Sequence, residues 1–451
     1  MLVGMRINQI FCILFLLATD LVAVINRDMR ICSNLIHQSN MASNVYWKIR
    51  NASLTAWYKF IPKYKNMLHS NCWYVNFKQI SPTLSRKLSS WSKLSNIDHQ
   101  YSVKEASKII NAVLGNNQRA SFIVNSSWSS VANKDFFCLP KVYLGGVPKC
   151  GTTTLYNLIV SHPNIEQPFD KEGQFWREFI LAPNQTYRDL EVLLYLYHFS
   201  SASKRMKSSN HQNPKLTIDA SASTVFASAK KWVNVEMDMC MVPLILSQVL
   251  PDTKLVFILR NPTDRLWSDY WYFCSRNQWM DKNGRVVVPD SVLTKSSEIF
   301  HNLSISAMQE FFDCVRHGAS EFECSMRAYS DTGEIHACQK VRLGISLYYF
   351  HVVKWLSVFN RQQLMFVRME DLIKDPYSVV SAVWRFMDLN PVSKTHFKNN
   401  VKTNVNTWIG SEKYKENFKM WTITRKSLST FFAPYNKRLS VLLNDSRYLW
   451  T

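Results

Sequence analysis

Short apolar runs separated by turn residues fill the chain from about residue 136 onward. Three of these runs are nearly all apolar, as is typical of parallel strands covered on both faces: Lys141–Leu144, Lys254–Leu259 and Leu364–Val367. Leu155, Leu158 and Ile159 follow the first run at helical spacing, and His162-Pro163 ends that helix because proline cannot continue it. A further helical pattern covers Leu343–Phe359. Alternating strands and helices predict an α/β fold with a mainly parallel sheet flanked by helices.

The first 135 residues have a different pattern. The apolar run Ile7–Ile25 is roughly the ~20 residues that span a bilayer, so we expect residues 1–25 to form a short tail and an uncleaved signal anchor. Asp20 would be costly inside a membrane, which leaves a cleaved signal peptide or a buried helix as alternatives. Residues 26–135 are rich in Ser, Asn and Lys and predict a stem that only spaces and presents a globular domain at 136–451.

Composition and charge narrow the possible functions. Hydrophobic residues make up 47% of the 451 residues, which excludes disordered and low-complexity classes. Lys and Arg outnumber Asp and Glu by 54 to 33, and the net charge of +21 predicts an anionic partner. Five N-x-[S/T] sequons agree with a secretory lumen, where nucleic acid is not met: Asn51, Asn125, Asn184, Asn302 and Asn444.

Ten cysteines also fit an oxidising compartment. Cys12 lies in the expected anchor, and the close spacing of Cys314, Cys324 and Cys338 predicts either a disulfide among them or buried thiols. No CxxC pair and no His/Cys cluster with zinc spacing occurs, so we expect no metal.

The segment Gly145-Gly-Val-Pro-Lys-Cys-Gly-Thr-Thr-Thr154 lies between a predicted buried strand and a helix start. Glycine backbone, free N–H groups at a helix N-terminus and the helix dipole together favour a bound anion. Lys149 adds a mobile positive charge. In a Walker A loop the lysine follows the last glycine, whereas here Lys149 precedes Gly151, which argues against an ordinary kinase or NTPase.

Pro148-Lys-Cys-Gly-Thr-Thr-Thr154 resembles the 5′-phosphosulfate-binding loop of sulfotransferases, which use 3′-phosphoadenosine 5′-phosphosulfate (PAPS). In that family an Arg and a Ser eight positions apart, after a strand, hold the 3′-phosphate, and Arg260 and Ser268 match this pattern. The resemblance therefore implies a set of PAPS-binding residues: Lys149, Cys150, Gly151, Thr152, Thr153, Thr154, Arg260 and Ser268.

Within this family the chain resembles the carbohydrate sulfotransferase 15 group over roughly residues 138–449. The stretches that carry this resemblance are Asp219–Thr224, Ile258–Tyr270, Val341–Tyr348, Trp355–Phe359 and Trp421–Thr424. The resemblance to this group implies a single-pass type II Golgi membrane enzyme that sulfates C6 of N-acetylgalactosamine 4-sulfate in chondroitin or dermatan sulfate. A sulfotransferase for another glycan, or a degenerate protein that only binds sulfated glycans, stays open.

Sulfonate transfer needs a general base that takes the proton of the acceptor hydroxyl. It also needs a positive group that stabilises charge on the leaving oxygen, and Lys149 is the candidate for this role. Glu172 is the candidate base, because related glycan sulfotransferases place a catalytic Glu in a similar Glu-x-x-aromatic-aromatic segment. Where some relatives have a catalytic lysine this chain has Asp219-Ala220, so Asp219 or Ser221 could orient the acceptor instead. Arg342, Lys402 and Asn404 are weaker anion-binding candidates, and a solvated basic surface is the expectation for them. The oligomeric state stays open.

Overall fold

In the computed structural model the described residues are 21–30, 32, 43–60, 72–75, 135–176, 179, 188, 191–192, 195–196, 198–207, 215–227, 235–276, 297–327, 341–400 and 419–450. The expected anchor, apart from residues 21–25, and most of the expected stem lie outside them. None of the helices formed by the described residues combines the length and the apolar character that a bilayer span requires.

A parallel sheet forms the centre of the described part of the chain, in the order β4-β5-β3-β6-β7. Its strands are β3 (Val142–Gly146), β4 (Ile165–Glu166), β5 (Leu216–Asp219), β6 (Lys254–Leu259) and β7 (Leu364–Arg368). The three strands predicted from apolar runs are confirmed as β3, β6 and β7. Every residue of β3, and all of β6 except Lys254, is buried, because helices cover both faces of the sheet.

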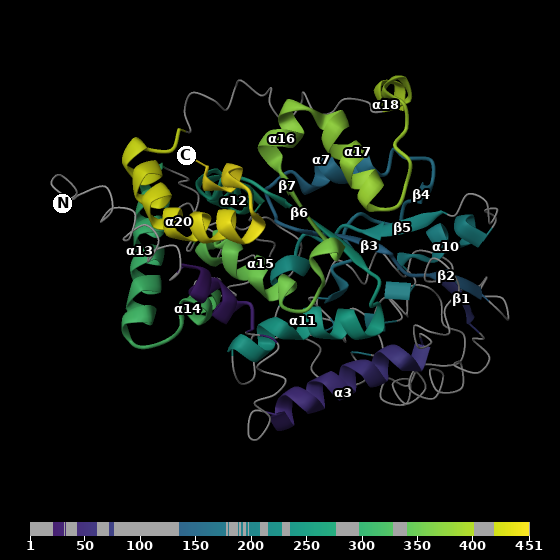
Figure 1. Cartoon of the computed structure of the whole chain (residues 1–451), viewed down its shortest axis with the longest axis horizontal. Coiled ribbons are helices and arrows are strands. Elements are labelled where there is room, and N and C mark those ends of the chain that lie inside the picture. Colours follow the sequence, from purple (N-terminus) through teal and green to yellow (C-terminus); the bar gives the residue numbers. More distant parts are fainter. Residues whose placement is uncertain are drawn as a thin grey trace, which may run out of the picture.

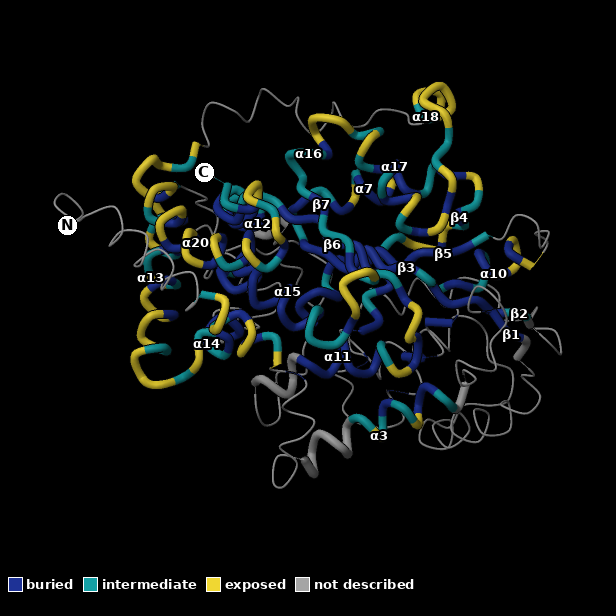
Figure 2. The backbone as a smooth tube through the Cα atoms, viewed as in Figure 1, coloured by how far each residue is buried: buried dark blue, intermediate teal, exposed yellow. Residues whose placement is uncertain are grey.

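Helices lie on both sides of this sheet, which confirms the predicted α/β class (Figure 1). In this view α7 and α17 lie on one side and α11 and α15 on the other, and the burial colours show the strands between them as buried (Figure 2). The helices of the α/β region are α7 (Thr152–Ile159), α10 (Ser200–Lys207), α11 (Val235–Val249), α12 (Pro262–Arg276), α13 (Ser297–Arg316), α14 (Glu321–Arg327), α15 (Tyr348–Leu356), α16 (Met369–Lys374), α17 (Pro376–Phe386), α18 (Lys394–Asn400) and α20 (Thr422–Leu443), with 3₁₀ turns η3 (Thr224–Phe226), η6 (Leu343–Ser346), η7 (Arg361–Gln363) and η9 (Ser446–Leu449).

The described part of the expected stem packs against the α/β core. Helix α3 (Ser43–Phe60) contacts α11, and its Trp57 is fully buried against Trp176, with ring centroids 5.6 Å apart. Residues 21–28 are helical and include the last residues of the expected anchor and the first of the expected stem, of which Asp28 accepts a hydrogen bond from the buried Tyr349 hydroxyl at 2.8 Å. These contacts differ from the expected spacing role, because a stem of that kind would leave its aromatic side chains in solvent.

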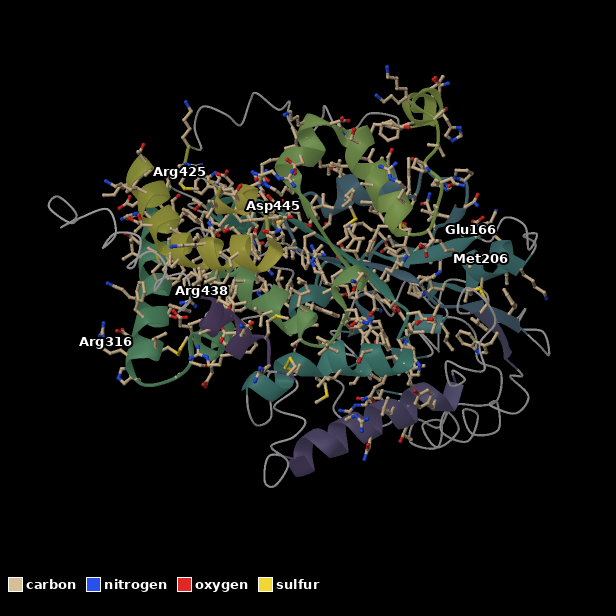
Figure 3. The ribbon with its side chains drawn as sticks, viewed as in Figure 1. Glu166, Met206, Arg316, Arg425, Arg438 and Asp445 are labelled. Carbon is tan, nitrogen blue, oxygen red and sulfur yellow. A yellow bond between two sulfur atoms is a disulfide. The ribbon has the colours of Figure 1, made fainter. Side chains whose placement is uncertain are left out.

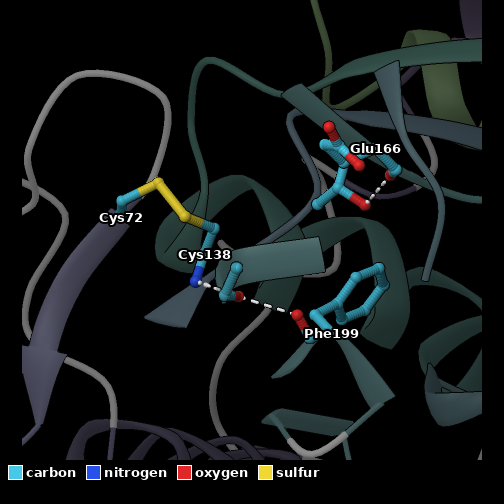
Figure 4. Close-up of a disulfide and its surroundings, with 6 residues drawn as sticks. Cys72, Cys138, Glu166 and Phe199 are labelled. Carbon is cyan, nitrogen blue, oxygen red and sulfur yellow. Dashed lines mark hydrogen bonds between the residues drawn. A yellow bond between two sulfur atoms is a disulfide. The ribbon is translucent and has the colours of Figure 1, made fainter. Parts of the chain in front are cut away.

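Disulfides join these N-terminal segments to the domain. Cys32 pairs with Cys240 of α11, and Cys72 pairs with Cys138, which links strand β1 (Cys72–Val75) to its antiparallel partner β2 (Asp135–Cys138). Figure 4 shows the second disulfide, beside which the Cys138 N–H donates to Ser203 Oγ at 2.8 Å. Cys314 pairs with Cys324, as one of the alternatives from their spacing predicted, and Cys338 lies outside the described residues.

Lys354 on α15 is fully buried, and its Nζ has no hydrogen-bond partner among the described residues. Burial lowers the pKa of this amine from 10.5 to about 7. Between pH 10.5 and 7, Lys354 binds a proton in the unfolded chain but not in the folded chain. This difference lowers the free energy of unfolding progressively as the pH falls from 10.5 to 7, and the loss is constant below pH 7.

We expect Lys354→Met to raise the free energy of unfolding by roughly 1–4 kcal/mol at pH 7. The gain should shrink as the pH rises from 7 toward 10, because the wild-type amine then loses its unfolded-state proton as well. Denaturant unfolding of both proteins at several pH values measures this. Lys437→Met, which removes an exposed lysine from α20, controls for net charge. A gain that is the same at every pH would contradict the explanation.

Candidate active site

The loop after β3 lies at the topological switch point of the sheet, where successive connections run to opposite sides of β3. Strand β3 lies between β5 on one side and β6 on the other, so the connections that leave β3 and β6 meet at the same edge. Ligands of open α/β sheets bind at the carboxyl ends of the strands at such a switch point. The predicted anion-binding loop Gly145–Thr154 follows β3 at this edge.

Glycines allow the loop to pass close to its neighbours and to enter α7. At Gly146 (φ +145°) an added Cβ would lie 2.6 Å from Val225 Cγ1, so only glycine fits there. Gly151 is the N-cap of α7 in the left-handed region, with φ 89°. The N–H groups of the first turn of a helix have no partner within that helix. Those of Thr152–Thr154 therefore remain to bind an anion, and the first turn carries no acidic residue.

Lys149 and Arg260 are brought together at this edge of the sheet. Arg260 lies directly after β6, and its Nη1 donates to the Lys149 carbonyl oxygen at 3.4 Å. The Lys149 ammonium lies over the ring of Tyr272 on α12, 3.5 Å from the ring centroid. Ser268 lies further along α12 and is half-buried. The two motifs found in the sequence therefore occupy neighbouring loops.

Cys150 takes part in the loop as a buried residue. Its N–H donates to the Val147 carbonyl oxygen at 3.2 Å, and its Sγ lies 3.5 Å from the Tyr348 hydroxyl. Burial raises the pKa of this thiol to about 11. The Cys150 side chain is therefore neutral at physiological pH and packs inside the domain against Tyr348.

Arg265, which was not predicted from the sequence, holds the loop by a hydrogen bond to its backbone. This fully buried side chain donates from Nε to the Pro148 carbonyl oxygen at 3.2 Å and pairs with Asp269 at 2.8 Å. Although burial of Asp269 raises its pKa, the adjacent guanidiniums of Arg265 and Arg342 hold it below its usual value. Arg342 was expected on a solvated surface, and its pairing with Asp269 corrects that expectation. Lys402 and Asn404 lie outside the described residues.

Glu172 reaches the same loop through a second residue that the sequence analysis did not single out. Lys171 donates from Nζ to Glu172 Oε1 at 2.5 Å and to Thr152 Oγ1 at 3.4 Å. The side chain of Glu172 is 32% exposed and that of Lys171 is 14% exposed. Glu172 is thus a partly buried carboxylate held beside the start of α7, with a face open to solvent. Lys171 could have been found from the sequence, because it is a cation that directly precedes the candidate base Glu172.

The segment after β5 fixes the backbone around Glu172. The Ala220 N–H donates to the Lys171 carbonyl oxygen at 3.2 Å, and Ser221 Oγ accepts from the Gln174 N–H at 2.7 Å. Asp219 is fully buried and accepts from the Tyr195 hydroxyl at 2.8 Å. Asp219 or Ser221 was named as a residue that could orient an acceptor; both are buried and hydrogen-bonded within the fold, where they hold the Glu172 segment.

The described residues contain no group of His, Cys, Asp and Glu side chains that could hold a metal ion. The charged groups of the loop after β3, the loop after β6 and the Glu172 segment that the site can use are Lys149, Lys171, Glu172 and Arg260. Cations beside free backbone N–H groups suit a phosphate or sulfate ligand. A carboxylate at their margin suits an adjacent hydroxyl that must lose a proton.

Comparisons with known proteins agree with this chemistry. Residues 139–432 match the model of the sulfotransferase domain. Human carbohydrate sulfotransferase 15 is 29% identical over 331 residues, which cover 69% of this chain and 55% of that protein. A Caenorhabditis briggsae bifunctional heparan sulfate N-deacetylase/N-sulfotransferase 1 is 25% identical over 68% of this chain and 30% of that protein. The chain thus spans about half the length, or less, of the curated relatives named here.

Solved structures also resemble the chain. A sulfotransferase from Alicyclobacillus acidocaldarius is 21% identical, with a TM-score of 0.41 over 69% of this chain and 99% of that chain. A mouse sulfotransferase in complex with PAP is 14% identical, with a TM-score of 0.34 over 69% of this chain and 87% of that chain.

Proposed function

Because the chain belongs to the sulfotransferase domain family, we propose that it transfers a sulfonate group from PAPS to a hydroxyl of a glycosaminoglycan. The observation that carries this proposal is the meeting of the Lys149 loop with Arg260 at the carboxyl ends of β3 and β6. A nucleotide with phosphates at both its 5′ and 3′ positions needs two neighbouring cationic sites, and these two loops supply them.

PAPS is the co-substrate, and the residues present fit it. Backbone N–H groups of Gly151–Thr154 and the side chains of Lys149 and Thr152 would hold the 5′-phosphosulfate. Cys150 contributes to the shape of this loop, because its thiol faces Tyr348 and its N–H is bonded within the turn. Arg260 and Ser268 would hold the 3′-phosphate. No metal ligand set is required, since cations of the chain itself offset the negative charge.

Transfer requires the acceptor oxygen, the sulfur and the leaving phosphate oxygen to lie in line. The bond from sulfur to the acceptor oxygen forms as the bond from sulfur to the 5′-phosphate oxygen breaks. Lys149 and the loop N–H groups stabilise the charge that grows on the leaving oxygen. Glu172 takes the proton of the acceptor hydroxyl. Lys171 positions Glu172, because its ammonium contacts both that carboxylate and Thr152.

For the acceptor we propose C6 of N-acetylgalactosamine 4-sulfate in chondroitin or dermatan sulfate. The resemblance to carbohydrate sulfotransferase 15 supports this choice, and the net charge of +21 suits a sulfated polymer. We also propose a single-pass type II protein of the Golgi membrane, with residues 1–25 as tail and anchor, 26–135 between anchor and domain, and 136–451 as the lumenal catalytic domain. The disulfides support an oxidising lumen.

A transfer assay tests this proposal. The full chain, expressed through a secretory pathway, is incubated with labelled PAPS and with chondroitin 4-sulfate, desulfated chondroitin or heparan sulfate. We expect label on chondroitin 4-sulfate at C6 of the N-acetylgalactosamine residue, read by disaccharide analysis. Preference for another glycan would retain the mechanism and reject the acceptor. Glycan binding without transfer to any acceptor would reject the enzyme and indicate a glycan-binding protein.

A further inference from the structure

We propose that Trp450, near the C-terminus, is a positioning residue for Arg260 and so sets the preference of the site for a nucleotide that carries a 3′-phosphate. This inference rests on the proposed function, because it assigns Arg260 to the 3′-phosphate. Trp450 lies beyond residues 139–432, which match the sulfotransferase domain, so the family resemblance gives it no role.

One carboxylate links Trp450 to the turn that carries Arg260. Glu370, the second residue of α16, accepts a hydrogen bond at Oε1 from the Trp450 Nε1–H at 3.1 Å. The same Oε1 accepts from the backbone N–H of Asn261 at 2.9 Å. Asn261 follows Arg260 in the chain, so the position of this carboxylate fixes the backbone from which the Arg260 side chain departs. The pairing of β6 with β7 explains the contact, because Leu259 lies opposite Arg368.

The ring of Trp450 is also held from the side of the Lys149 loop. It packs on Tyr348 and on Tyr448, with ring centroids 5.9 Å and 5.5 Å apart. The Tyr348 hydroxyl lies 3.5 Å from Cys150 Sγ, inside the loop. Trp450 therefore contacts Glu370, which binds the turn expected to hold the 3′-phosphate, and Tyr348, which contacts the loop expected to hold the 5′-phosphosulfate.

Ion pairs fix the short segment that presents Trp450. Arg447, on η9, pairs with Asp371 at 2.8 Å and with Asp445 at 2.7 Å. Asp445, labelled in Figure 3, follows the end of α20 and also accepts from the Arg447 N–H at 2.9 Å. The segment after α20 is thus joined to the residues after β7, and these contacts fix the place of Trp450.

The charge of Glu370 explains why the contact matters for phosphate binding. Glu370 Oε2 is buried without a hydrogen-bond partner among the described residues, and Arg368 Nε lies 3.8 Å from it. The Glu370 side chain as a whole is 36% exposed, and the Trp450 N–H offsets part of the carboxylate's negative charge at Oε1. Without this N–H, more of the negative charge remains beside the turn Arg260–Asn261, whose backbone Glu370 binds, and this charge opposes an incoming phosphate. The effect is confined to ligands with a 3′-phosphate, since the 5′ site has its own cation, Lys149.

Calorimetric titration of the full chain with adenosine 3′,5′-bisphosphate and with adenosine 5′-monophosphate tests this inference. Trp450→Phe keeps the aromatic packing and removes the N–H. We expect it to weaken the bisphosphate about fivefold, as loss of one hydrogen bond of about 1 kcal/mol would, while the monophosphate changes less than twofold. Adding Glu370→Gln to Trp450→Phe should restore most of the bisphosphate affinity, because the opposing charge is gone.

Two further variants calibrate the measurement. Arg260→Ala should abolish the preference for the bisphosphate altogether. Tyr377→Phe removes an aromatic hydrogen-bond donor elsewhere, the one to the Val392 carbonyl oxygen, and should change neither nucleotide. An equal loss for both nucleotides in Trp450→Phe, or no loss for either, overturns the inference. A wild-type protein that binds both nucleotides equally would instead reject the assignment of Arg260 in the proposed function.

Discussion

Replacing Lys149 with alanine should lower kcat for sulfonate transfer by about 10²–10³-fold, the effect of losing one preorganised charge-stabilising group at a reacting centre. Lys149 lies in the loop between β3 and α7, and its flexible stem can carry the ammonium from the Tyr272 ring to the leaving oxygen. The loop N–H groups remain in the variant, so part of the stabilisation survives. Initial rates with labelled PAPS at saturating acceptor measure the effect.

Lys141→Ala is the matched control for this variant. Lys141 precedes the amino end of β3, whereas Lys149 follows its carboxyl end, so both changes remove one lysine beside the same strand. Lys141 is paired with Asp388 at 3.6 Å, away from the loop. Its removal should leave kcat within about twofold, since exposed pairs of this kind are worth little. Equal rates for Lys149→Ala and wild type would show that the leaving charge is stabilised elsewhere.

Glu172→Gln should lower kcat by about 10²–10⁴-fold, because the amide keeps the shape of the side chain but cannot accept the acceptor proton. The amide oxygen can still accept the hydrogen bond from Lys171 Nζ, so the segment between α7 and β5 should keep its conformation. Binding of adenosine 3′,5′-bisphosphate should therefore stay close to that of wild type.

Single-turnover rates and nucleotide titration, made on the same preparation, separate chemistry from binding in this variant. Glu298→Gln, an exposed acid in the first turn of α13, serves as the control for loss of one negative charge. Near-normal turnover in Glu172→Gln would remove Glu172 from the mechanism. Loss of nucleotide binding together with turnover would show that its part is structural.

The parts of the fold that could be predicted from sequence are those whose signal is local. Strands β3, β6 and β7 are apolar except for Lys254 at the start of β6 and Arg368 at the end of β7. The loop after β3 contains its glycines, lysine and threonines in one stretch. Strand β4 spans only Ile165–Glu166, which is too short to show a period of two. The helix expected over Leu343–Phe359 is divided into η6 and α15, because Leu347 leaves the helical region with φ −82° and ψ 63°.

In the candidate site, too, the residues with a local sequence signal could be predicted and those defined by tertiary contacts could not. Lys149 and Arg260 belong to motifs, so their meeting could be expected from the order of the strands. Arg265 and Lys171 act through partners that tertiary folding supplies, namely the carbonyl oxygen of Pro148 and the hydroxyl of Thr152. No spacing along the chain encodes those contacts. Trp57 was hidden for a similar reason, since a single aromatic residue in a polar region gives no periodic signal.

The disulfide between Cys32 and Cys240 has a consequence for how the chain matures. The two cysteines are 208 residues apart, so the first is synthesised long before its partner. At about 5–20 residues per second, Cys32 waits on the order of 10–40 seconds during synthesis. Cys72 and Cys138 arrive within that interval and offer competing thiols. Cys32 must therefore stay unpaired, or exchange any earlier partner, until Cys240 has been synthesised.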